Sequence, residues 1–296
     1  MSLTIRDLDA EQLGAWPLPG PAGGKEGRGR VVVVGGSRRT PGAVLLAAEA
    51  AMRAGAGKPQ VATVESVAVA VSVALPEALV TDLHETTDGE IVAKAAEQVL
   101  ELADGCDALL LGPGLMSPES ASELLDELVP RLDCPVVLDA LAMAYLTERP
   151  DGVAHLDGRV VLTPNDSELA ETLGRDEAEV ADDPAQSCVE LANRSGATVV
   201  AGGETTYIAV PRSDVVWRHP GVPGLGAAGS GDVKAGIVAG LLARGVPPEG
   251  AAAWAVVLHL TAGRTVSEHE APLGFLARDV LPWIPRVMAQ LSSRAQ

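Results

Sequence analysis

A glycine-rich turn that leads directly into an acidic residue is the clearest chemical signal in the chain. Residues 224–236 read GLGAAGSGDVKAG, and Asp232 falls at the start of an expected helix. Free backbone N–H groups at a helix start, together with the helix dipole, favour an anion such as phosphate. Because the residues of 227–231 are small, such an anion could approach the backbone closely. We therefore predict an anion hole over this turn.

Asp232 suggests that the turn takes part in catalysis. The helix dipole keeps a first-turn carboxylate ionised, so Asp232 could accept a proton from a substrate hydroxyl that attacks a phosphoryl group held by the turn. The alternative is that Ser230 and Asp232 only cap a long helix, and the motif alone leaves both interpretations open. Residues 224–229 also match G-x-G-x-x-G, but HPGVP stands before them where a dinucleotide fold requires a strand.

A second polar pair stands in LTPNDSE, residues 162–168. Asn165 and Glu168 are three residues apart at an expected helix start, so their side chains can face one point. An amide and a carboxylate suit Mg²⁺ bound through water, which makes Glu168 a candidate metal residue. The same spacing also fits a capping box. Considered without the rest of the chain, the pair favours the capping box over the metal site.

Other polar residues are expected to have structural roles. Lys234 lies two residues after Asp232, and we expect its side chain to point away from the site. The five histidines show no metal-ligand spacing, and each is expected on the surface or in packing: His84, His155, His219, His259 and His269.

The elements that must position these residues alternate along the chain. Buried strands are expected at 30–36, 107–114 and 159–164, each followed by a helix, then short strands near 198–219 with the last two antiparallel, and helices from 230 onward. Strands that alternate with helices indicate a parallel sheet covered on both faces. Because ligands bind at the carboxyl ends of such strands, the glycine and polar residues that follow strands should share one edge.

This pattern predicts an α/β fold, a single three-layer αβα sandwich with a mostly parallel sheet. Residues 1–29 are expected as an N-terminal lead-in that is mostly loop, because 17–29 are rich in glycine and proline. Residues 30–296 are expected to form the catalytic domain. Its last helix is expected over 273–292.

The charge balance argues against nucleic acid and anionic membranes as partners. The 296 residues include 22 Lys and Arg against 40 Asp and Glu, a net charge of −18, whereas both partners require basic surfaces. The N-terminus is acidic where a signal peptide is basic, and no apolar stretch is long enough to span a bilayer. Cys106, Cys134 and Cys188 are scattered, which fits a reducing compartment. We expect a cytoplasmic protein that forms a homo-oligomer.

Seven stretches occur in the same order as in a known family. They cover about residues 25–265 and are GRVVVVGGS, PGAVLLAAEAAMRAGAG, LPEALV, LLLGPGL, VVLDA, LTPNDSE and GSGDVKAGIVAGLLARG. In these motifs the chain resembles the ADP/ATP-dependent NAD(P)H-hydrate dehydratases of the ribokinase-like superfamily. The resemblance implies a ribokinase-like αβα sandwich and a repair reaction. In that reaction ADP or ATP phosphorylates the hydroxyl of hydrated NADH or NADPH, and loss of phosphate restores the nicotinamide ring.

The resemblance also implies which residues form the site. Ala43, Gly114 and Asp232 would contact the hydrated dinucleotide, with Asn165 standing where the family usually has histidine. Asp232 would be the catalytic base. The adenine nucleotide would be held by the loop after one strand and by the glycine turn, through Ala201, Gly202, Gly203, Glu204, Thr205, Gly229, Ser230 and Gly231.

The chain departs from the family's motifs at three places. The family's DAD is Asp139-Ala140-Leu141, its LKG is Val200-Ala201-Gly202, which loses a lysine, and its AGD is Ala262-Gly263-Arg264. Asn165-x-x-Glu168 is more similar to the N-x-x-E of vitamin and sugar kinases in the same superfamily. These departures leave two alternatives open: a Mg-ATP-dependent kinase of a small hydroxylated metabolite, and a nucleotide-binding homologue with impaired catalysis.

Overall fold

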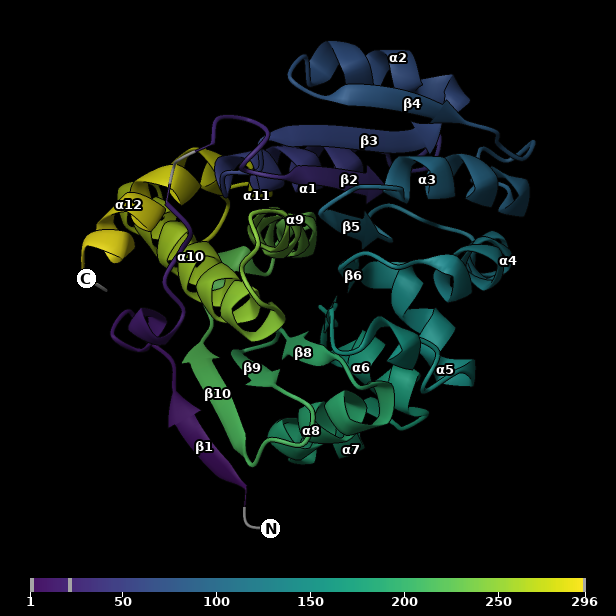
Figure 1. The fold of residues 1–296 in the computed structure, drawn as a ribbon. Coiled ribbons are helices and arrows are strands. Elements are labelled where there is room, and N and C mark those ends of the chain that lie inside the picture. The colour runs from purple at the N-terminus through teal and green to yellow at the C-terminus, as the bar shows by residue number, and fades with distance from the viewer. Residues whose placement is uncertain (1–2, 21–22, 295–296) are drawn as a thin grey trace.

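The computed structural model describes residues 3–20 and 23–294, and in this part of the chain ten strands form one sheet (Figure 1). The strand order is β1-β10-β9-β8-β7-β6-β5-β2-β3-β4, and neighbours are parallel except for the β8–β9 and β9–β10 pairs. The predicted mostly parallel sheet is confirmed, as is the antiparallel excursion. The strands are β1 (Thr4–Asp7), β2 (Arg30–Val34), β3 (Lys58–Val64), β4 (Leu79–Leu83), β5 (Ala108–Leu111), β6 (Val136–Leu138), β7 (Val160–Leu162), β8 (Thr198–Ala201), β9 (Thr205–Ala209) and β10 (Val215–Pro220).

Helices cover both faces of this sheet, which gives the predicted three layers (Figure 1). Helices α1, α9, α10 and α12 pack in one core, and α3, α4, α6 and α8 pack in the other. The α-helices are α1 (Pro41–Arg53), α2 (Glu65–Ala74), α3 (Ala96–Ala103), α4 (Pro118–Leu128), α5 (Tyr145–Glu148), α6 (Asp166–Leu173), α7 (Glu177–Asp182), α8 (Pro184–Ser195), α9 (Ser230–Ala243), α10 (Pro248–His269), α11 (Ala277–Val280) and α12 (Ile284–Arg294).

The central strands are apolar on both faces because both faces are covered. In β2, Val31 and Val33 point into one core and Val32 and Val34 into the other, all of them buried. Alternation along the pleat therefore divides one run of valines between two layers.

Helix α9 is buried along nearly its whole length and lies directly against α1. A side chain at Gly236 would come within 2.2 Å of the Ala47 carbonyl oxygen, and one at Gly240 within 2.4 Å of the Ala51 oxygen. Only glycine permits this approach. The contact fixes the N-terminus of α9, where the predicted catalytic residue lies, against α1.

The structure departs from the sequence prediction at both ends of the chain. The segment predicted as mostly loop contains β1, which pairs in parallel with β10, as Ile5 does with Val216. The single helix predicted over 273–292 is instead α11, a short 3-10 turn and α12. Pro282 lies in that turn, where proline interrupts the helical hydrogen bonds.

No helix among the described residues 3–20 and 23–294 combines the length and the apolar character that a membrane crossing requires.

Candidate active site

The loops that follow four neighbouring strands meet at one edge of the sheet, as predicted. The Asp139 N–H, after β6, donates to the Leu111 carbonyl at the end of β5 (3.0 Å). The Gly202 N–H, after β8, donates to the Pro164 carbonyl after β7 (2.9 Å). The hydroxyl of Thr163 donates to Asp139 Oδ1 (2.6 Å). These bonds bring the candidate residues of separate loops to one place.

A cavity of about 420 Å³ lies at this edge, beside the N-terminus of α9. A side chain at Gly231 would meet no atom within 4 Å, so a ligand can reach the backbone of the turn. Five predicted site residues line the cavity: Asn165, Gly202, Gly203, Ser230 and Gly231. Four further residues predicted to bind the nucleotide lie outside its lining: Ala201, Glu204, Thr205 and Gly229.

Asp232 lies in the first turn of α9, after Gly229 has set the helix start with a left-handed φ of +88°. Burial raises the pKa of its carboxyl to about 7, and the carboxylates of Asp139 and Glu168 add to the increase. Desolvation and like charge therefore outweigh the helix dipole, which was expected to keep Asp232 ionised. A carboxyl with a pKa near neutrality suits a general base.

Two of the residues predicted to contact the dinucleotide lie next to each other. Ala43 and Gly114 are adjacent, because a side chain at Gly114 would come within 2.9 Å of Ala43 Cβ. The Thr40 hydroxyl fixes this contact by donating to the Gly114 carbonyl (2.7 Å). Ala43, Gly114 and Asp232 are half-buried, and they line neither the cavity beside α9 nor the neighbouring cavity of about 210 Å³ that Glu168 lines.

Asn165 and Glu168 form the capping box that their spacing favoured. Asn165 Oδ1 accepts from the Glu168 N–H, and Glu168 Oε2 accepts from the Asn165 N–H, each at 2.9 Å. Burial raises the pKa of Glu168, the Asn165 N–H lowers it, and the Asp139 charge raises it further. Glu168 is thus both a cap and a member of a group of three carboxylates, with Asp139 and Asp232.

The prediction that Lys234 points away from the site is wrong. The residue is only 8% exposed, and it lines the cavity beside α9. Its Nζ lies 2.7 Å from the position that a Cβ of Gly202 would occupy, so the absence of a side chain at the end of β8 leaves room for the ammonium. The signal available in the sequence was a single lysine within the otherwise apolar run VKAGIVAGLLA.

His259 of α10 also belongs to this cavity, although we expected it only on the surface or in packing. It is buried, and its Nε2 lies 3.1 Å from Ser230 Oγ. Burial lowers its pKa to about 3, and the Lys234 charge acts in the same direction. The imidazole is therefore neutral at physiological pH and holds Ser230 at the helix start.

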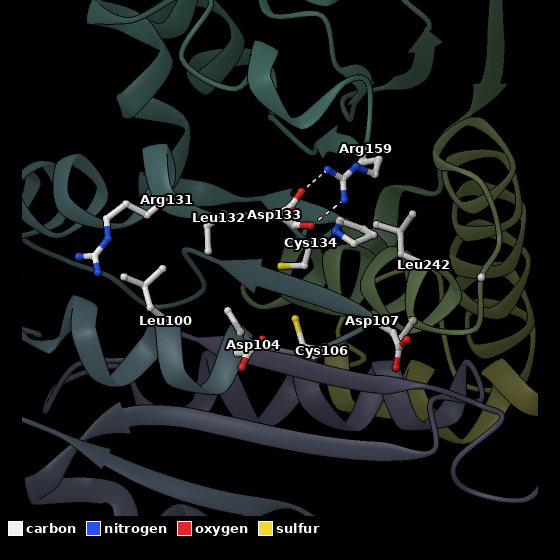
Figure 2. A pocket seen from close by; sticks show the side chains of 15 residues that line it. Leu100, Asp104, Cys106, Asp107, Arg131, Leu132, Asp133, Cys134, Arg159 and Leu242 are labelled. Atoms are coloured by element: carbon white, nitrogen blue, oxygen red, sulfur yellow. Dashed lines mark hydrogen bonds and ion pairs between the residues drawn. The ribbon is translucent and has the colours of Figure 1, made fainter.

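A larger cavity, of about 740 Å³, lies at the opposite edge of the sheet, where β5 and β6 begin. Figure 2 shows the thiols of Cys106 and Cys134 facing each other there, with Arg159 hydrogen-bonded to Asp133. No predicted site residue lines it. Because ligands of such sheets bind at the carboxyl ends of strands, the smaller cavity beside α9 is the candidate site.

Comparison with known sequences shows which family the chain is similar to. The family model described as NAD(P)H-hydrate dehydratase matches residues 31–286. A Xanthomonas campestris protein named ADP-dependent (S)-NAD(P)H-hydrate dehydratase is 43% identical over 289 residues, which are 97% of each chain. A bifunctional NAD(P)H-hydrate repair enzyme of Moorella thermoacetica is 35% identical over 90% of this chain, which spans about half (51%) of that relative.

Solved structures give the same result. An ADP/ATP-dependent NAD(P)H-hydrate dehydratase from Bacillus subtilis, co-crystallized with ATP/Mg²⁺, has a TM-score of 0.78 and 29% identity over 98% of this chain and 99% of its own. A hydroxyethylthiazole kinase from Pyrococcus horikoshii has a TM-score of 0.53 and 19% identity over 81% of this chain and 92% of its own, a likeness of fold alone. The comparisons therefore support the dehydratase interpretation over the kinase alternative.

Proposed function

Because the chain belongs to the NAD(P)H-hydrate dehydratase family, we propose that it dehydrates (S)-NAD(P)H-hydrate to NAD(P)H in an ADP-dependent reaction. The relative named for this activity covers 97% of the chain. The structural observation that carries the proposal is Asp232, with a pKa of about 7, next to the open backbone of Gly231. A base and an anion hole side by side are what phosphorylation of a hydroxyl requires.

Each group of residues in the site has a separate role in this reaction. The hydroxyl oxygen of the hydrate attacks the terminal phosphoryl group of the nucleotide, and Asp232 accepts the proton of that hydroxyl. AMP is released when ADP is the donor. The N–H groups at the start of α9, including that of Gly231, stabilise the charge on the phosphoryl oxygens. Phosphate then leaves with the electrons of its C–O bond, a proton is lost from the neighbouring ring carbon to solvent, and the double bond of the nicotinamide ring is restored. Ala43 and Gly114 form the surface against which the hydrated dinucleotide lies.

The proposed reaction is tested directly with hydrated NADH, Mg²⁺ and either ADP or ATP. Recovery of the near-ultraviolet absorbance of the reduced cofactor, dependent on the nucleotide, is the expected result. The donor that supports the faster recovery is expected to be ADP. Nucleotide turnover only with another alcohol would instead indicate a kinase, and binding without turnover would indicate an impaired homologue.

The donor set at this edge fits a magnesium ion held through water. Glu168 and Asp139 supply carboxylates, and one oxygen of Glu168 accepts the capping hydrogen bond. Within the described part of the chain no group of three His, Cys, Asp or Glu side chains has the geometry to hold a metal directly. When bound, Mg²⁺ would neutralise negative charge on the nucleotide phosphates.

The metal role of Glu168 predicts a separable effect of Glu168→Gln. Glutamine keeps an oxygen for the capping box, so the melting temperature should stay close to that of the wild type. The Mg²⁺ concentration for half-maximal rate should rise several-fold, because the neutral amide attracts a hydrated cation less. Glu177→Gln, at an exposed acid in the first turn of α7, is the matched control. An unchanged Mg²⁺ requirement would restrict Glu168 to the cap.

The anion hole predicts that Gly231→Val weakens nucleotide binding without unfolding the protein. The added side chain meets no protein atom near its Cβ, so it projects into the space that phosphate would occupy. We expect calorimetry to show at least a tenfold weaker affinity for ADP, about 1.4 kcal/mol. Gly20→Val, also at a position with nothing within 4 Å, serves as the control. If the folded Gly231→Val variant binds ADP with the affinity of the wild type, the predicted anion hole is wrong.

We also propose a reducing compartment, the cytoplasm, and a homo-oligomer. All three cysteines are free and buried, which supports a reducing environment. Helix α2 exposes Val69 and Val73, each at 78%, and the edge strand β4 exposes Leu79 at 57%. Apolar side chains beside an open strand edge support association with a second copy of the chain.

A further inference from the structure

We infer that Lys234 binds the phosphates of the adenine nucleotide, as the cation of a site otherwise dominated by carboxylates. The inference rests on the proposed function, because it assigns a further residue to the same nucleotide site. The inference is based on the position of the ammonium in the cavity, on its lack of an ion pair, and on the carboxylates that surround the cavity.

The position of Lys234 connects the two segments predicted to hold the nucleotide. It belongs to α9, one turn after Ser230 and Gly231, and it lines the same cavity as both. Its Nζ reaches the end of β8, at 2.7 Å from the position of a Cβ on Gly202. The ammonium therefore stands between the open turn and the β8 loop, where a bound phosphate would contact both.

The ammonium also lacks a charged partner. Lys234 is 8% exposed, yet within residues 3–20 and 23–294 no carboxylate oxygen lies within 4.0 Å of its Nζ. A buried cation without an ion pair is unfavourable, and an anionic ligand in the cavity would supply the missing partner. The side that remains free is the cavity, which is lined by the backbone of Gly202, Gly203 and Gly231.

The charges around the cavity explain why a cation is needed there. Burial lowers the pKa of Lys234, and the charges of Asp139, Glu168 and Asp166 at longer range partly oppose that effect by favouring the ammonium. The same carboxylates would repel a nucleotide diphosphate in a chain whose net charge is −18. A lysine ammonium, a compact charge with three donors, offsets that repulsion and complements the N–H groups of the helix start.

The test compares Lys234→Met with the wild type in binding ADP and adenosine by calorimetry. Methionine keeps an unbranched apolar stem and removes the charge and the donors. Charged hydrogen bonds of this kind contribute about 1.5–3 kcal/mol, so we expect ADP to bind roughly 10- to 100-fold more weakly. Adenosine, which has no phosphate, should bind within about twofold of the wild type. Lys58→Met, which removes a surface ion pair with Glu26, is the matched control and should change neither affinity.

Thermal unfolding accompanies the binding measurements, because removal of a buried charge should leave the melting temperature of Lys234→Met equal or higher. A folded variant with unchanged ADP affinity overturns the inference. An equal loss for ADP and adenosine also overturns it, since Lys234 would then only shape the cavity. If the wild type binds ADP but does not restore NADH from its hydrate, the proposed dehydration fails while the role of Lys234 is still decided by the ADP and adenosine affinities.

Discussion

The Asp232→Asn variant is expected to fold and to bind ADP at least as well as the wild type. It should dehydrate the hydrate at least about a hundredfold more slowly, because a general base contributes roughly 10²- to 10⁴-fold to the rate. Asparagine preserves the size of the side chain and its place in the first turn of α9. It removes the lone pair that accepts the proton, and with it one negative charge near the phosphates. Steady-state turnover and ADP calorimetry on the same preparation measure the two effects.

The stability of this variant provides a control for the loss of activity. Because the folded pKa of Asp232 is raised to about 7 from 3.8, the folded chain binds more protons than the unfolded chain between those values. Stability contributed by this group is therefore lost as pH rises through that window. The asparagine side chain does not titrate, so the stability of the variant does not fall in this way. Near pH 8 the variant should therefore be more stable than the wild type. The difference should be at most about 4 kcal/mol, since one pKa unit corresponds to about 1.4 kcal/mol.

A matched substitution separates catalysis from the general effect of removing a first-turn acid. Glu119 lies exposed in the first turn of α4, and it lines neither of the two cavities at this edge of the sheet. Glu119→Gln should leave turnover unchanged and alter stability by less than about 1 kcal/mol, the value of a charge near a helix dipole. Near-normal turnover of the Asp232 variant would show that Asp232 is a cap, and the proposed base would be rejected.

The second large effect is the pH dependence of the wild-type rate. Only the ionised carboxyl of Asp232 accepts a proton, and its pKa is raised to about 7 by burial and by Asp139 and Glu168. Below that pH the rate should fall roughly tenfold for each pH unit, and above it the rate should level off. The measurement is kcat/KM for the hydrate from about pH 5.5 to about pH 8.5 at saturating nucleotide and Mg²⁺.

The pH profiles of two variants test whether Asp232 is the titrating group. In Asp232→Asn the residual rate should lose the slope, because the titrating group is gone. In Glu168→Gln, which removes one neighbouring negative charge, the midpoint should move to lower pH. A wild-type profile that stays flat below neutrality would contradict Asp232 as the base, whatever the rate of its asparagine variant.

The sequence by itself determined the architecture and the edge at which the site lies. Runs such as RVVVV and ALLL, each followed by a helical pattern, predict a parallel sheet covered on both faces, and the loops after those strands then share one edge. The glycine turn and Asp232 could be located in the same way. These features depend on the order and periodicity of nearby residues, which a sequence displays directly.

The tertiary structure decided what those residues experience. The pKa of Asp232 depends on burial and on Asp139 and Glu168, which arrive from other loops. Lys234 turns inward because Gly202, distant in sequence, leaves space for it, and the chain has no lysine at 201, where the family motif places one. The pairing of β1 with β10 joins segments at opposite ends of the sequence. Side-chain direction, desolvation and long-range pairing are set by contacts across the folded chain, and local pattern carries no record of them.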